Sequence, residues 1–167
     1  EVTERASLLN YFISVAKKLY KLQNYYGCSL ILYTFDNAFA SLKATKALIA
    51  KNDINFIEET KNQIANFSTD SNVIQQFFRE SLSKMPTIPV IFPYKSSIQS
   101  TIKGYLIEDD KIKIPVLMEI FKLVCEFEEF QKKKYNFYAI DQAQDLFEIC
   151  NSPKTLNELI DYAKKLE

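Results

Sequence analysis

Most apolar residues of this chain recur at intervals of three and four, the spacing that places them on one side of an α-helix. The pattern is longest near the start, where Thr3 can cap a helix over residues 4–23. One apolar series in this stretch consists of Leu8, Phe12, Val15, Leu19 and Leu22, and a second consists of Leu9, Ile13, Ala16 and Tyr20. We expect the first series to be buried along one side, and the two stripes together to embed the helix among several others.

Polar breaks divide the following stretch into shorter helices. Residues 24–27 end the first helix, and Asp36-Asn37 has the composition of a turn. The helices expected around these breaks span about residues 29–35, the stretch from that turn to residue 48, residues 53–67, and the stretch from the polar loop 68–72 to residue 84.

A proline-bounded segment over residues 85–104 then predicts a protruding helix with one apolar edge. The residues that form this edge are Tyr94, Ile98 and Ile102, with Ile91 and Tyr105 one helical step beyond its ends. The same spacing fits an ordinary core helix equally well.

A second helix follows an exposed turn at residues 108–111. Residues 112–114 have the composition of a short extended piece, and Pro115 suits the first turn of a helix that continues to Lys133. We therefore expect residues 89–131 to form two antiparallel helices that project from the main body. Two further helices are expected from about residues 142 and 153.

The composition indicates one all-α domain over residues 1–167. The chain has only 2 glycines, which leaves little turn chemistry for a sheet, and 47% of its residues are hydrophobic. A chain of this length buries roughly 70% of its unfolded surface. No internal repeat or long linker divides it.

Charge and residue usage exclude several kinds of function. Lys plus Arg balances Asp plus Glu at 21 each, and there are only two arginines, so we expect no nucleic-acid partner. The chain has no histidine, no glycine-rich phosphate loop and no recognisable zinc-ligand set, so most familiar catalytic arrangements are absent and we expect no cofactor. We expect no membrane span, because no apolar run approaches the required length. The 3 separated cysteines favour reduced thiols and a cytoplasmic location.

Several segments, in order along the chain, resemble the catalytic domain of Ras-type guanine-nucleotide exchange factors. They are ERASLLNYFI at residues 4–13, LQNYYG at 22–27, PTIP at 86–89, Gln131 with YNF at 135–137, and LIDYAKKLE at 159–167. The family domain is longer, and its N-terminal portion has no counterpart here. The resemblance therefore implies the C-terminal two-thirds of such a domain, with a protruding helical hairpin over about 89–131.

The resemblance also implies a function, namely binding a small GTPase of the Ras superfamily and promoting nucleotide release by inserting the hairpin. On this basis the expected partner-binding residues are Asp36, Tyr94, Ile98, Gln99, Ile102, Lys103, Met118 and Glu119. Counted without gaps, Gln99 stands where family members carry a leucine and Lys103 where they carry a glutamate. A slip of one residue puts Ile98 and Ile102 at those places instead. Asp36 stands near a family asparagine.

Two other functions remain open from the sequence. The altered hairpin residues also fit a module that binds a GTPase or another protein without exchanging nucleotide. The acidic residues Glu126, Glu128 and Glu129 could serve a conventional enzyme, although their spacing better fits a solvated helix face. Because the family's N-terminal helices have no counterpart, we expect Leu8, Leu9, Phe12 and Ile13 to be uncovered, or to be covered by a second chain or an oligomer.

Overall fold

The computed structural model describes residues 1–64, 71–105, 107–108 and 111–137 of the chain. Within these residues it is all-helical apart from one short antiparallel ribbon, so the predicted fold class is confirmed. The elements are α1 (Val2–Lys21), α2 (Tyr25–Ser41), α3 (Lys43–Ala47), α4 (Lys51–Ile64), α5 (Ser71–Lys84), α6 (Phe92–Tyr105), β1 (Ile107–Glu108), β2 (Lys111–Ile112) and α7 (Ile114–Lys132). The helices predicted from residues 142 and 153 lie outside the described residues.

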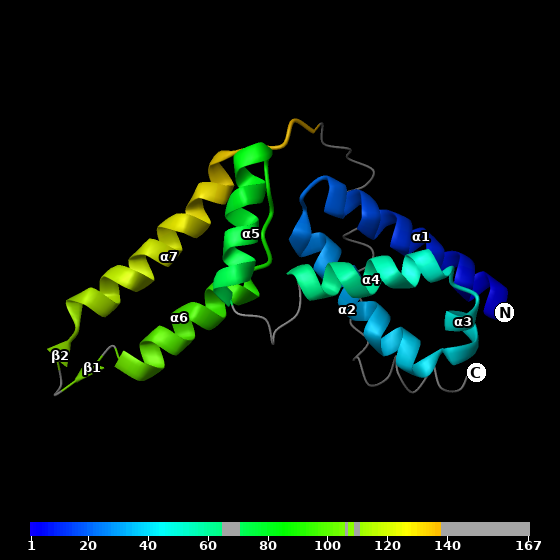
Figure 1. The fold of residues 1–167 in the computed structure, drawn as a ribbon, viewed down its shortest axis with the longest axis horizontal. Helices are drawn as coiled ribbons and strands as arrows, with labels where there is room; N and C mark the ends of the chain where they lie inside the picture. Colours follow the sequence, from blue (N-terminus) through cyan, green and yellow to red (C-terminus); the bar gives the residue numbers. More distant parts are fainter. Residues whose placement is uncertain (65–70, 106, 109–110, 138–167) are drawn as a thin grey trace, which may run out of the picture.

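The helices form two arms that meet at an apex (Figure 1). One arm is the body, in which α1 to α4 pack together, and the other is the hairpin of α6 and α7, joined at its far end by the β1–β2 ribbon. Helix α5 stands at the base of the hairpin, between the two arms (Figure 1). The hairpin therefore projects from the body and does not lie within it.

The expected orientation of the first helix is wrong, because the second apolar stripe is the buried one. Ile13 and Ala16 are 1% and 0% exposed and lie in the core with residues of α2, whereas Leu8 and Phe12 are 56% and 41% exposed. The small side chain of Ala16 lets α1 and α2 approach closely. Of the residues expected to be uncovered, Leu8 and Phe12 are exposed, but Leu9 is half-buried and Ile13 is buried.

The predicted turn at Asp36-Asn37 is also wrong, because α2 continues through it without a break. Phe35 and Phe39 stack in parallel on either side of the expected turn, with ring centroids 5.5 Å apart. Asp36 forms an ion pair with Lys61 of α4. The stacked pair within α2 and the ion pair with α4 outweigh the local preference of Asp and Asn for turns. Ile114, expected to be extended, is the first residue of α7.

A tight corner between α1 and α2 holds both ends of the hairpin. The backbone N–H of Ile88, which precedes α6, donates to the carbonyl oxygen of Gln23 at 2.9 Å. The hydroxyl of Tyr135, which follows α7, donates to the carbonyl oxygen of Leu22 at 2.6 Å. Gln23 has a φ of 57°, in the left-handed region, which turns the chain sharply enough to present these carbonyl groups.

An aromatic cluster packs α5 against the start of α2. The ring of Phe78, which is fully buried, stacks on Tyr25 with centroids 5.5 Å apart. Phe77 contacts the same tyrosine at 5.1 Å, and the Tyr25 hydroxyl shares a 3.0 Å hydrogen bond with Ser81. Burial of these rings is the main apolar attachment of α5 to the body.

Polar contacts then attach the hairpin to α5. One oxygen of the Glu126 carboxylate on α7 accepts hydrogen bonds from Arg79 Nε of α5 at 2.7 Å and from the Tyr94 hydroxyl of α6 at 3.0 Å. The Gln75 amide of α5, 1% exposed, donates to Ser97 of α6 at 3.0 Å. Three helices therefore meet at one carboxylate, which fixes the direction in which the hairpin projects. Burial of Tyr94, followed by the nearby Glu126 charge, raises the pKa of its hydroxyl.

The first prediction concerns the aromatic cluster. Replacing Phe78 by alanine should lower the free energy of unfolding by about 3–5 kcal/mol, because it leaves a cavity against Tyr25. The change would be measured by urea unfolding followed by circular dichroism. Val73→Ala is the control on the same helix, since Val73 is 61% exposed and should change stability by less than about 0.5 kcal/mol. Equal losses for the two variants would contradict this packing.

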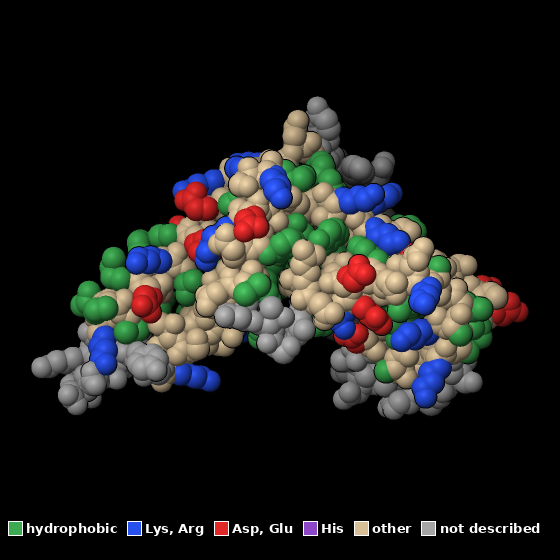
Figure 2. Space-filling view, in the orientation of Figure 1, with side chains coloured by type: hydrophobic (Ala, Val, Ile, Leu, Met, Phe, Trp, Pro, Cys, Tyr) green, Lys and Arg blue, Asp and Glu red, His purple; other side chains and the backbone are tan. Residues whose placement is uncertain are grey.

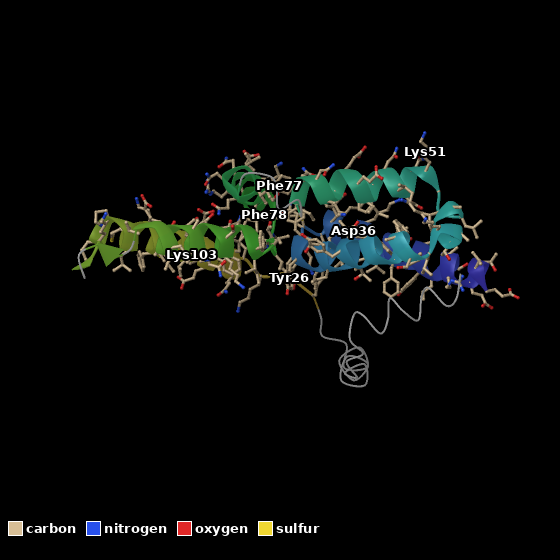
Figure 3. The ribbon with its side chains drawn as sticks, turned by 90° about the horizontal axis from the view of Figure 1, so that it is seen from below. Tyr26, Asp36, Lys51, Phe77, Phe78 and Lys103 are labelled. Carbon is tan, nitrogen blue, oxygen red and sulfur yellow. The ribbon has the colours of Figure 1, made fainter. Side chains whose placement is uncertain are left out.

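The second prediction concerns the hairpin root. Glu126→Ala removes the shared acceptor of Arg79 and Tyr94, so the hairpin should vary more in its angle to the body. Spin labels at Lys103→Cys and Lys51→Cys, on opposite arms (Figure 3), would report this as a broader distance distribution. Cys125 and Cys150 would be replaced by serine, whereas Cys28 can stay, because burial raises the pKa of its thiol to about 12.

Glu128→Ala is the matched control for this measurement. Glu128 lies on the same helix but is exposed, and it should leave the distance distribution unchanged. A Glu126→Ala distribution as narrow as that of the control would show that the carboxylate does not set the hairpin angle.

Candidate functional site

The outline of the molecule is concave between the two arms, and we call this concave side the hollow (Figure 2). Helix α6 lies on the inner side of the hairpin arm and α7 on its outer side (Figure 1), and Figure 2 shows the hollow between the arms. Seen from this side, Lys103 on α6 comes into view together with Tyr26 and Asp36 on α2 (Figure 3). Lys103 therefore belongs to one arm, and Tyr26 and Asp36 belong to the other.

The apolar edge predicted for α6 passes from the interior to the surface along the helix. Tyr94 at the root is 2% exposed, Ile98 is half-buried, and Ile102 near the tip is 45% exposed. Tyr94 packs its ring edge-on against Phe127 and Phe130 of α7. Sequence spacing alone could not separate these roles, because all three residues share the same period of four.

Gln99 and Lys103 lie one turn apart on the exposed side of α6. Between Phe92 and Tyr105 the charged residues are Lys95 and Lys103, and there is no acidic residue. This side of the hairpin therefore presents polar and positively charged groups next to the exposed Ile102.

A groove of about 470 Å³ runs between α6 and α7. Its apolar lining includes Ile91, Ile98 and Val124, and its polar edges carry Lys95 and Glu128. A second groove of about 450 Å³, lined by Ser100, Thr101, Lys113, Val116 and Glu119, also lies between these helices. Ile98 thus contributes to the contact between α6 and α7, whereas Ile102 lines neither groove.

Met118 and Glu119 are adjacent in sequence but do not share a surface. Met118 is 51% exposed, on the outer side of α7, whereas Glu119 lines the second groove beside α6. The structure therefore brings Gln99, Ile102 and Lys103 together near the hairpin tip and leaves Met118 apart from them.

Asp36 lies on the body arm, where its carboxylate pairs with Lys61. A pocket of about 230 Å³ beside this pair is also lined by Lys46 and Glu58. The pocket thus has two cationic and two anionic side chains on its walls. Asp36 itself remains exposed on α2.

Sequence analysis did not predict the roles of three residues that shape the site. Tyr26 is 40% exposed at the apex of the hollow, where its N–H donates to the Ile88 carbonyl oxygen at 3.2 Å. Arg79 and Glu126 set the hairpin root, and the hydrogen bond to Glu126 raises the pKa of Arg79. The only sequence signal for Tyr26 was its position directly before Gly27. No sequence pattern pairs Arg79 with Glu126.

The acidic residues of α7 do not converge on one point. Glu126 contacts Arg79 and Tyr94, Glu129 pairs with Lys132, and Glu128 lies at the groove edge. Within the described residues, no cluster of Cys, Asp and Glu could hold a metal ion. Among those same residues, no helix is both long and apolar enough to cross a membrane.

Comparison with known proteins agrees with the architecture. The sequence model of the RasGEF domain matches residues 1–138. The chain is also 26% identical over 139 residues to Ras guanine nucleotide exchange factor K of Dictyostelium discoideum, a match that covers 80% of this chain and 9% of that protein. The chain thus spans less than a tenth of the length of this relative. Since the family match extends over most of the sequence, the chain belongs to the RasGEF domain family, the Ras-type exchange-factor domains.

Proposed function

We propose that this domain binds a small GTPase of the Ras superfamily in the hollow between its arms and promotes release of the bound nucleotide by inserting α6. The observation that carries the proposal is the projecting hairpin, whose inner helix exposes Gln99, Ile102 and Lys103 toward its tip. A protruding, firmly rooted helix can enter a partner, whereas a helix packed in the core cannot.

Such a function needs no covalent chemistry. A GTPase holds its nucleotide through a magnesium ion and backbone amides around the phosphates. An exchange factor accelerates release by binding the nucleotide-free state better than the loaded state, and its effect is limited by that difference. Acceleration by about 10⁵-fold requires roughly 7 kcal/mol of such preference. A hairpin that is already fixed at its root can supply this preference, because less of the binding free energy is lost in ordering the helix.

The charge of α6 indicates the surface of the partner. Lys95 and Lys103 are exposed and have no acidic neighbour on their helix. They would attract an acidic patch of the GTPase and guide its encounter with the hollow. We also propose that the domain acts in the cytoplasm, which agrees with the free thiols of Cys28 and Cys125.

Exposure favours the ungapped match of α6 to the family. Gln99 and Lys103 are exposed, whereas Ile98 is half-buried, although both Ile98 and Gln99 line the groove beside α7. We therefore propose that Gln99 and Lys103 occupy the positions that family members give to leucine and glutamate. An ammonium group cannot accept a hydrogen bond as a carboxylate does, and it attracts phosphate.

This departure supports a second candidate function. With Lys103 at the position where family members carry a glutamate, the domain would bind a GTPase without expelling its nucleotide. The two functions differ in one measurement, the release of a fluorescent guanine nucleotide from a panel of Ras-superfamily GTPases, read together with binding to their nucleotide-free forms. We expect release to be accelerated for at least one GTPase. Binding without acceleration would establish the second function, and neither binding nor release would contradict both.

The third prediction tests the apolar contact of the hairpin tip. Ile102→Asp should abolish nucleotide release and weaken GTPase binding at least tenfold, because it places a charge in a desolvated contact. Ile98→Asp should also abolish release, but it would disturb the packing of α6 on α7 as well. Leu8→Asp is the matched control, since Leu8 is a similarly exposed apolar residue on α1 of the body arm. Equal effects of Ile102→Asp and Leu8→Asp would argue against insertion of α6.

The fourth prediction tests the role of Lys103. Lys103→Glu should leave release intact or raise it, because it restores an acceptor that competes for the contacts of the magnesium ion and the phosphates. Lys95→Glu serves as the comparison, since it makes the same charge change nearer the root and should slow association without adding that acceptor. If wild-type release is robust and Lys103→Glu destroys it, the ammonium group has a positive role that this proposal lacks.

A further inference from the structure

The C-terminal ends of three helices meet at the apex of the molecule. The hydroxyl of Tyr135, which follows α7, donates to the carbonyl oxygen of Leu22 at the end of α1, at 2.6 Å. The ammonium of Lys133, at the end of α7, donates to the carbonyl oxygen of Leu82 in the last turn of α5, also at 2.6 Å. These two contacts hold the ends of α1, α5 and α7 together.

Each of these helix ends carries exposed lysines, which together we call the apex patch. Its members are Lys18 and Lys21 of α1, Lys84 of α5, and Lys132, Lys133 and Lys134 at the end of α7. Figure 2 shows Lys and Arg side chains gathered along the upper, convex outline of the molecule, over these helices. The patch is a local concentration of positive charge on a chain whose formal net charge is 0.

The charge of the apex patch exceeds what its surroundings neutralise. Three carboxylates lie within four residues of patch lysines in sequence, those of Glu80, Glu128 and Glu129, and Glu129 pairs with Lys132. Lysines in the last turn of a helix also offset the negative end of the helix dipole, which amounts to about half a charge per helix. Six lysines against three carboxylates and three helix ends leave an excess of roughly 1.5 positive charges.

An exposed aromatic pair directly follows the lysines of α7. Phe137 is 65% exposed, and its ring stacks on that of Tyr135 with centroids 5.1 Å apart. Because the Tyr135 hydroxyl is bound to the backbone of Leu22, this pair is held at the same corner as the lysines. The convex apex therefore combines positive charge with an apolar ring presented to solvent.

We propose that the convex apex binds the surface of a membrane that contains anionic lipids, with the lysines against the headgroups and Phe137 at the headgroup level. Lysine is a flexible point charge, which suits many mobile headgroups better than one fixed bidentate contact. Each lysine near such a surface strengthens binding roughly fivefold, and aromatic rings favour the boundary between headgroups and acyl chains. The patch is spread over three helix ends on a convex face, so it fits a broad surface better than a single bound peptide.

This orientation leaves the hollow open. The convex apex lies on the side of the molecule opposite to the hollow (Figure 1). A domain that rests on a membrane through its apex keeps both inner helices accessible to a partner. The inference does not rest on the proposed function, because lipid binding can be measured on the protein alone.

The test is cosedimentation of the whole chain with vesicles of phosphatidylcholine, either pure or with a third of the lipid replaced by phosphatidylserine. Wild type should bind only the anionic vesicles, and added salt should release it, because salt screens the charges. Lys84→Glu combined with Lys134→Glu should weaken binding at least about tenfold. Lys43→Glu with Lys51→Glu, at the far end of the body arm (Figure 3), makes the same change in net charge and should leave binding unchanged.

A second variant separates a lipid surface from other polyanions. Phe137→Ala should weaken binding to the anionic vesicles severalfold, because it removes the ring from the headgroup boundary. Circular dichroism of each variant shows whether its helices are intact. A wild type that ignores anionic vesicles, or a control pair that weakens binding as much as the apex pair, would overturn the proposal. Equally tight binding to a short duplex DNA, with no effect of Phe137→Ala on the vesicles, would overturn the assignment to lipid.

Discussion

The corner between α1 and α2 is the constraint on which the two-armed shape depends. Within a few residues it accepts hydrogen bonds from both sides of the hairpin, from Ile88 before α6 and from Tyr135 after α7. The Thr87 hydroxyl adds a third bond, to the Gln23 side chain at 2.6 Å. The backbone of Gln23 must adopt a left-handed conformation to make this possible, which is unfavourable for a residue other than glycine. Three of the sequence segments that resemble the RasGEF family, at residues 22–27, 86–89 and 135–137, meet here.

In the proposed function, a fixed corner lets a small domain act on a partner without covalent chemistry. The corner, the rings of Tyr25 and Phe78, and the Glu126 carboxylate hold the hairpin at three separate levels. Together these contacts make the hairpin and the body one unit. In the proposed function, binding energy gained at the hairpin tip is used to change the shape of the partner, since little of it is lost in bending the hairpin.

The sequence predicted the helices better than their surroundings. Prolines and polar turns marked both ends of the hairpin, because proline restricts the backbone locally whatever the fold around it. Asp36-Asn37 was an equally local signal, in this case for a turn, but α2 continues through it. The contact of Asp36 with Lys61 belongs to the tertiary structure, which a local pattern does not report. Likewise, the spacing of the two apolar stripes on α1 does not tell which of them packs against α2.

The candidate site was predictable in part for the same reason. Periodicity identified α6 and its edge residues, but it treated Tyr94 and Ile102 alike, although one is 2% exposed and the other 45%. Which of them faces a partner depends on where α7 and α5 lie. The shared contact of Arg79 and Tyr94 with Glu126 joins residues 47 and 32 positions apart, and no local pattern encodes it.

The account is tested most directly by mapping where a bound GTPase protects the domain. Amide hydrogen exchange would be followed with and without a nucleotide-free GTPase that binds. Protection should concentrate on α6 and on the part of α2 that faces the hollow, while α1 and the outer side of α7 exchange as in the free protein. Protection confined to α1 or to α7, with α6 unchanged, would contradict a GTPase site in the hollow.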